Sequence, residues 1–292
     1  LPPFPAYPAP MRYLLTILVA VSASLLTSYL STTPSHSSAA ESTSSRVLRT
    51  GTLRCGYNFW EPALTRNEST GQLEGFYADV IKLLSQETGL NIQLHHVVDW
   101  GQVQAELKSG KIDAMCAMWN TTTESRIFLF TQPFSYQSVE AIGRQNEVKF
   151  KNIQDINMPD VTIAIVDNAT QDFIARDSFP QAKRISVPNM ASNADLMMDV
   201  ATGKADITFT NPGIFEGFNQ HNPNQLKRLF PHTPLRLYGN SIALSQGEYD
   251  LANLLNVAIQ HLINRGEIDK LIDIYNAKYP ETFLKPTSTH QS

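Results

Sequence analysis

The sequence predicts an α/β protein of two lobes, each a mostly parallel sheet flanked by helices, with two extended strands joining the lobes. Strand-like and helix-like patterns alternate along the chain in two βαβαβ units of about equal size. Two further amphipathic helices follow near the C-terminus. Alternation of this kind places helices on the faces of a parallel sheet, and the repetition of the unit predicts two such sheets.

The first unit lies between residues 53 and 118. Short apolar runs predict strands, and apolar residues at three-and-four spacing predict helices. The expected order is strand 53–57, helix 76–88, strand 91–98, helix 102–108 and strand 112–118.

The second unit follows the same order, with strands at 161–166, 184–187 and 205–209 and helices that start at 171 and cover 191–202. The two C-terminal helices are expected at 251–264 and 267–275, packed on the first lobe. Extended segments at 136–142 and 235–244 carry the chain out of the first lobe and back. Two crossings make a hinge, and ligands belong between the lobes, at the carboxyl ends of the strands.

This path divides the chain into lobes. Residues 46–140 and 240–283 are expected to form lobe one, 141–239 lobe two, and 284–292 a tail.

The first 45 residues differ from the rest. Met11, Arg12 and Tyr13 precede an apolar stretch at 14–30 and a small-residue tract, a pattern typical of a secretory signal peptide. The alternative is an uncleaved membrane anchor, because the apolar stretch is long for a signal. We interpret residues 1–45 as upstream residues, signal peptide and linker, and we expect a periplasmic or extracellular protein.

Composition excludes several classes of function. The chain of 292 residues has a net charge of −4 and no basic run, so no nucleic-acid partner is expected. His95 and His96 alternate in a strand-like run and would point to opposite faces, so no metal site is expected. We expect no cofactor.

Five motifs occur in a recognisable order: Gly51–Tyr57, Gly71–Val80, Gly110–Ala114, Thr121–Arg126 and Gly203–Asp206. Together, over residues 46–283, they resemble the family 3 extracellular solute-binding proteins. The resemblance implies the type II periplasmic binding-protein fold and the uptake of polar amino acids and related solutes. It implies a monomer without enzymatic activity, whose partners are a small polar ligand and the permease of an ABC transporter.

The resemblance assigns ligand-binding roles. Arg126 would bind a ligand carboxylate, for which a guanidinium fork is suited, and Thr121 opens the same segment. Thr170, where the first strand of lobe two meets its helix, would either cap that helix or present its hydroxyl and amide to an anion.

Aromatic residues are expected to wall the site. Trp60 follows the first strand, and Trp119 ends the third. Each could also be core packing, but two indoles facing one cleft would favour a planar or cationic ligand group.

Asn211 departs from the family pattern. Relatives that bind α-amino acids place an aspartate there, which pairs with the ligand ammonium. Either Glu61 or Asp167 meets the ammonium instead, or the ligand is not a standard α-amino acid. Because Asn before Pro is also a common turn residue, Asn211 could have no ligand role.

Two other functions compete with solute binding. A dehydratase that acts on prephenate-like or arogenate-like acids could use the same fold, with Glu61 or Glu216 as the acid. A sensor domain would need a following transmembrane helix, and we expect none here.

Cys55 and Cys116 leave two alternatives. They lie in the first and third strands of lobe one, which run side by side in this fold, and an oxidising compartment permits a disulfide. However, cysteines in buried parallel strands are more often small apolar residues, so buried free thiols are the expectation.

Overall fold

The computed structural model describes residues 41–187, 192–231 and 233–286. Their main sheet has the strand order β4-β1-β5-β12-β7-β10-β8-β9, and β2 (Thr65–Arg66) and β3 (Leu73–Glu74) form a separate ribbon. No helix in these ranges is both long and apolar enough to cross a bilayer. The apolar stretch interpreted as a signal peptide lies outside the described residues.

Two groups of three parallel strands confirm the predicted pair of βαβαβ units. In lobe one, β1 (Thr52–Tyr57) lies between β4 (Asn91–Val97) and β5 (Ala114–Asn120) and runs parallel to both. In lobe two, β8 (Thr162–Val166) lies between β10 (Ile207–Thr210) and β9 (Lys183–Val187), again parallel to both. Each central strand is almost completely buried, as expected for a sheet covered on both faces.

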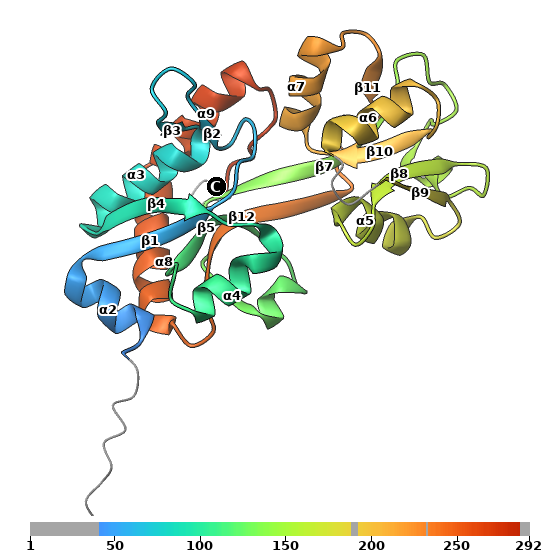
Figure 1. Ribbon diagram of the computed structural model, residues 1–292. Helices are drawn as coiled ribbons and strands as arrows, with labels where there is room; N and C mark the ends of the chain where they lie inside the picture. The colour runs from blue at the N-terminus through green and yellow to red at the C-terminus, as the bar shows by residue number, and fades with distance from the viewer. Residues whose placement is uncertain (1–40, 188–191, 232, 287–292) are drawn as a thin grey trace, which may run out of the picture. The chain divides into compact units, whose positions relative to one another are not determined.

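Two long antiparallel strands join the groups, as the sequence predicts. These are β7 (Ser135–Arg144) and β12 (Arg236–Ser245), which run side by side in Figure 1. β12 continues along β5 and β7 continues along β10. The short strands β6 (Phe128–Phe130) and β11 (Leu226–Arg228) pair with β12 and β7 respectively.

Helices cover both groups of strands. Those of lobe one are α2 (Thr43–Thr50), α3 (Phe76–Thr88), α4 (Val103–Lys108), α8 (Tyr249–Asn264) and α9 (Glu267–Lys278). Those of lobe two are α5 (Thr170–Ser178), α6 (Asn193–Ala201) and α7 (Pro212–His221). Three short 3-10 turns are η1 (Trp100–Gln102), η2 (Glu124–Arg126) and η3 (Ile153–Ile156). α8 and α9 share one apolar core with α3 and β1, which confirms that the C-terminal helices pack on lobe one.

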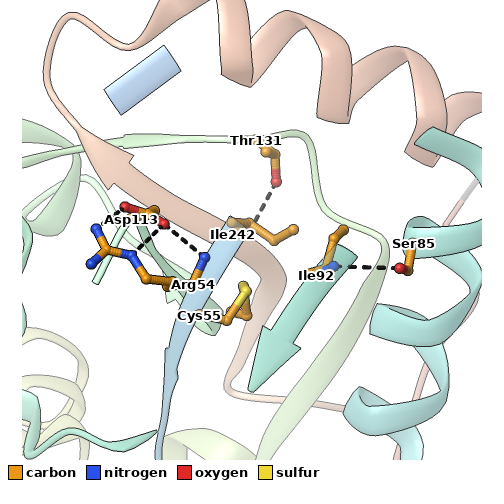
Figure 2. The surroundings of a disulfide bond; sticks show 8 residues. Arg54, Cys55, Ser85, Ile92, Asp113, Thr131 and Ile242 are labelled. Atoms are coloured by element: carbon orange, nitrogen blue, oxygen red, sulfur yellow. Dashed lines mark hydrogen bonds and ion pairs between the residues drawn. A yellow bond between two sulfur atoms is a disulfide. The ribbon is translucent and has the colours of Figure 1, made fainter. Parts of the chain in front are cut away.

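One aspartate ties the first strand to the third in each lobe. In lobe one, Asp113 Oδ2 accepts from the Arg54 backbone N–H at 2.7 Å, and the Asp113 N–H donates to the Arg54 carbonyl at 2.8 Å (Figure 2). In lobe two, Asp206 makes the same two bonds to Thr162, at 2.8 and 2.9 Å. Each aspartate ends a Gly-Lys-x-Asp motif, so the repeated motif fixes the register of the parallel strands.

The Asp113 carboxylate is also ion-paired. It accepts from Arg54 Nε at 3.1 Å and Nη2 at 2.8 Å, and it pairs with Arg46 of α2. Its side chain is only 1% exposed. Burial by itself would raise the pKa of Asp113, but the bonds from Arg54 and Arg46 outweigh it and hold the pKa below the ordinary value.

Cys55 and Cys116 form a disulfide bond, with their Cα atoms 5.4 Å apart (Figure 2). The expectation of buried free thiols is therefore wrong, although both cysteines are buried. Both strands are irregular at the bond: the pairing of β1 with β4 shifts between Cys55 and Gly56, and β5 bulges at Ala117, where φ is 111°. Because bulges re-aim side chains, these neighbouring parallel strands can turn their cysteines toward each other.

The disulfide should be measurable in solution. Thiol counting on the denatured, unreduced protein should find no free thiol. The bond closes a loop of 61 residues, so reduction should lower the free energy of unfolding by about 4 kcal/mol in the chain-entropy model. In the double variant Cys55→Ala/Cys116→Ala, a reductant should leave the melting temperature unchanged. Two free thiols in the native protein would contradict the bond.

The Asp113 ion pairs should make stability depend on pH. The pKa of Asp113 is lower in the folded state than the unfolded value of about 3.9. The stabilisation that the Asp113 carboxylate gives to the folded state is therefore fully present above about pH 4, and it is lost as the pH falls through the folded-state pKa. We expect Asp113→Asn to lower the free energy of unfolding at pH 7 by about 1–3 kcal/mol, and this difference to shrink on acidification. Urea unfolding from pH 7 to pH 3 measures it; a difference independent of pH would refute this role.

Candidate functional site

Trp60 and Trp119 contact each other at the carboxyl ends of β1 and β5. Their ring centroids are 4.7 Å apart, with planes tilted by 59°. Trp119 also stacks on Tyr238 of β12, at 4.6 Å and 17°, and Trp60 meets Trp100 edge-on at 6.4 Å. A planar ligand group cannot lie between two indoles this close. The structure therefore supports a shared aromatic wall, with any ligand against one side of it.

A buried polar network connects this wall to the crossing strands. Trp119 Nε1 donates to Gln137 Oε1 of β7 at 3.0 Å. The Tyr77 hydroxyl lies 2.7 Å from Asn240 Oδ1 of β12, and Asn240 Nδ2 donates to Ser135 Oγ at 2.9 Å. Sequence reasoning did not identify this network. The available signal was an amide residue, Gln137 or Asn240, inside each segment predicted to cross between lobes, and the structure buries both completely.

Thr121 and Arg126 lie in the turn that follows β5. Thr121 Oγ1 accepts from the Glu124 N–H at 3.1 Å and so fixes the turn. Arg126 ends η2 and is exposed, and within the described ranges its guanidinium has no hydrogen-bond or ion-pair partner. Glu124, which sequence reasoning did not single out, is partly buried, and burial raises its pKa. The turn therefore presents a cation beside a carboxyl group that holds its proton more strongly than usual.

Thr170 and Asn211 begin the helices that follow two neighbouring parallel strands, β8 and β10. The carboxyl ends of parallel neighbours meet at one edge of a sheet, so both helix starts lie on the same edge. Thr170 is the first residue of α5, and the preceding Ala169 caps the helix without a side-chain bond. The capping interpretation of Thr170 is therefore wrong, and no hydrogen bond of its hydroxyl occurs within the described ranges.

Asn211 caps α7 and is almost completely buried. Its Oδ1 accepts from the Ile214 N–H at 2.8 Å, and Pro212 takes the first helical position. The residue is 1% exposed, and its Nδ2 has no hydrogen-bond partner in the described part of the chain. Leaving a buried amide donor unpaired costs about 1–3 kcal/mol. A ligand atom that accepts a hydrogen bond would remove this cost.

The loop that carries Trp60 lies against the start of α7. A Cβ atom built on Gly213 would lie 2.6 Å from Thr282 Cγ2 and 3.0 Å from Pro62 Cδ, so a glycine is needed where these segments meet. Trp60 Nε1 is also buried without a partner among the described residues. Two segments in contact, the loop after β1 and the start of α7, thus each hold an N–H donor that has no partner in the described ranges.

The two acids proposed as ammonium ligands lie near cations of the protein. Glu61 is exposed, and its charge helps to raise the pKa of Lys278, after the larger effect of the Tyr279 hydrogen bond. Asp167 lines a depression of about 470 Å³ together with Arg176, Lys183 and Arg184. Neither position indicates a carboxylate reserved for a ligand ammonium.

The two-lobed architecture, with loops and helix starts gathered at the carboxyl ends of parallel strands, is the type II periplasmic binding-protein fold. The chain belongs to the bacterial extracellular solute-binding proteins, family 3, whose sequence model matches residues 53–278. The predicted fold class and resemblance are therefore confirmed.

Similar proteins include binders and a sensor. A probable amino-acid ABC transporter-binding protein of Haemophilus influenzae is 23% identical over 231 residues, covering 77% of this chain and 85% of that protein. The virulence sensor protein BvgS of Bordetella bronchiseptica is 25% identical over 194 residues, which are 66% of this chain but 15% of the sensor. The crystal structure of AncCDT-1, an ancestral amino acid-binding protein and precursor of cyclohexadienyl dehydratase, has a TM-score of 0.62 at 24% identity. It covers 82% of this chain and 99% of its own, and it shows the shared fold.

The capping role of Asn211 can be separated from its unused donor. Asn211→Ala removes the cap and should lower the free energy of unfolding by about 0.5–2 kcal/mol. Asn211→Asp keeps an oxygen for the Ile214 N–H but buries a charge, so above pH 5 it should separate the loss of the cap from the burial of a carboxylate. Thermal unfolding of the three proteins tests this. Equal melting temperatures for native and Asn211→Ala would show that the cap contributes nothing.

Proposed function

We propose that this protein captures a small polar, carboxylate-bearing solute, an amino acid or a related acid, between its lobes and delivers it to an ABC transporter. The observation that carries the proposal is a set of N–H donors at the carboxyl ends of the strands that have no partner in the described part of the chain. They are the guanidinium of Arg126, Nε1 of Trp60 and Nδ2 of Asn211. Because donors require acceptors, these groups suit the oxygens of an acid.

Several findings support a role in capture and delivery. The family is named for extracellular solute binding, and the Haemophilus influenzae relative is named as a transporter-binding protein. We keep the division into lobe one, at 46–140 and 240–283, and lobe two, at 141–239. Bending of β7 and β12 would then close the lobes on the ligand. In this role the protein is a periplasmic or extracellular monomer, with the membrane permease as its partner.

An enzyme on the same fold is the second candidate. A dehydratase of prephenate-like acids needs an acid that keeps its proton near neutral pH. Burial raises the pKa of Glu124, and Glu124 lies two residues from Arg126. This makes Glu124 a better candidate acid than Glu61, which is exposed, or Glu216, in the middle of α7. Incubation with prephenate distinguishes the functions, since an enzyme releases phenylpyruvate and a binding protein leaves the acid unchanged.

Arg126 provides the direct test of carboxylate capture. A bond between a charged donor and a carboxylate contributes about 1.5–3 kcal/mol, so Arg126→Ala should weaken carboxylate binding at least tenfold. Because Arg126 is exposed and without a described partner, the melting temperature should stay the same. Calorimetry of the native and variant chains, with ligands found in a thermal-shift screen of amino acids and organic acids, measures the loss.

A matched control is Arg265→Ala, which removes an exposed arginine at the end of α8. It should leave affinity unchanged. If Arg126→Ala keeps the native affinity within threefold, Arg126 does not hold the carboxylate.

A further inference from the structure

We infer that the site selects organic acids whose second polar group is an oxygen acceptor, such as 2-oxo acids, 2-hydroxy acids and dicarboxylates, over α-amino acids. The inference rests on the proposed function and names its ligand class. It depends on what Asn211 and Trp60 leave free for a ligand.

Asn211 has a single acceptor atom, and α7 already uses it. Oδ1 receives the Ile214 N–H at 2.8 Å, and the side chain is buried. The group that remains is Nδ2, a donor without a partner among the described residues. A ligand ammonium is also a donor, so Nδ2 and an ammonium would repel each other. An aspartate could cap the helix with one oxygen and bind an ammonium with the other, which Asn211 cannot do.

The orientation of the Asn211 carboxamide is fixed by the cap. Turning it over would place Nδ2 against the Ile214 N–H, two donors facing each other, and would leave the start of α7 uncapped. The donor is therefore the end of Asn211 that the helix leaves unused.

Trp60 supplies a second donor of the same kind. Its Nε1 is buried and unpartnered, and its loop contacts the start of α7 where Gly213 approaches Pro62. An oxygen acceptor can receive a hydrogen bond from either donor, whereas an ammonium can receive none.

The acids near the site do not reverse this preference. Glu61 and Asp167 lie near Lys278 and the arginines of β9 and α5. Glu124 is partly buried with a raised pKa, which weakens it as a partner for an ammonium. It is nevertheless the one nearby acid that shares a turn with Arg126, so the experiment includes it.

The test is calorimetry of the full chain with ligands that share a carbon skeleton: glutamate, 2-oxoglutarate and glutarate; aspartate, malate and succinate; phenylalanine, phenyllactate and phenylpyruvate. In each set that binds, at least one of the two acids without an ammonium group should bind at least tenfold tighter than the amino acid. Asn211→Asp should reverse the order. Asn211→Ala, which removes both the cap and the donor, should weaken the oxygen acids without improving the amino acids. Asn219→Asp, which adds the same charge elsewhere on α7, should leave the order unchanged.

The outcomes separate the inference from the proposed function. Any native preference smaller than tenfold, or one for the amino acid, overturns the inference and leaves carboxylate capture standing. If the Glu124→Gln variant then no longer binds the preferred amino acid, Glu124 is the residue that binds the ligand ammonium. If no acid in the panel binds, carboxylate capture itself is wrong, and the inference with it.

Discussion

Two carboxylates, one buried and one partly buried, hold the architecture together at the amino ends of its parallel strands. Asp113 and Asp206 each bridge the first and third strands of their lobe through paired backbone bonds to Arg54 and Thr162. Asp206 also receives the guanidinium of Arg144 on β7, at 3.1 Å, so the same clamp anchors a crossing strand. With strand register fixed at one end, the opposite ends are free to carry loops and helix starts of irregular geometry, and the candidate site is built from these.

Local patterns specify much of this fold, and contacts between distant segments specify the rest. The predicted limits of α3 match the structure because apolar spacing and Gly89 define both ends. α2 has local cap residues, Ser42 and Gly51, but only eight residues and few apolar ones. Its first amides are also bound by Glu248, 204 residues away, which no local pattern reveals. α7 was missed for another reason: Asn211 and Pro212 were interpreted as a turn, although an Asn cap followed by Pro also begins helices. The disulfide escaped prediction because regular strand geometry disfavours it, and both strands are irregular there.

The candidate site likewise depends partly on local patterns and partly on contacts between distant segments. Sequence order could place Trp60, Trp119, Arg126 and Asn211 at the ends of strands, but it could not show which polar atoms remain unused after folding. That depends on tertiary partners, such as the Ile214 amide that takes Asn211 Oδ1 and the Gln137 oxygen that takes the Trp119 indole. The partners of Trp119 also lie on both crossing strands, Gln137 on β7 and Tyr238 on β12. A change in the twist of these strands must therefore move the aromatic wall.

The aromatic wall also determines how the protein responds to light. The chain contains three tryptophans, and Trp60 contacts both Trp100 and Trp119. Selectively excited indole fluorescence therefore originates entirely from this one cluster, with no background from the rest of the molecule. Indoles this close exchange excitation energy, so quenching of one ring dims all three. The native protein thus carries an intrinsic optical probe confined to its candidate ligand site, with no dye or engineered label needed.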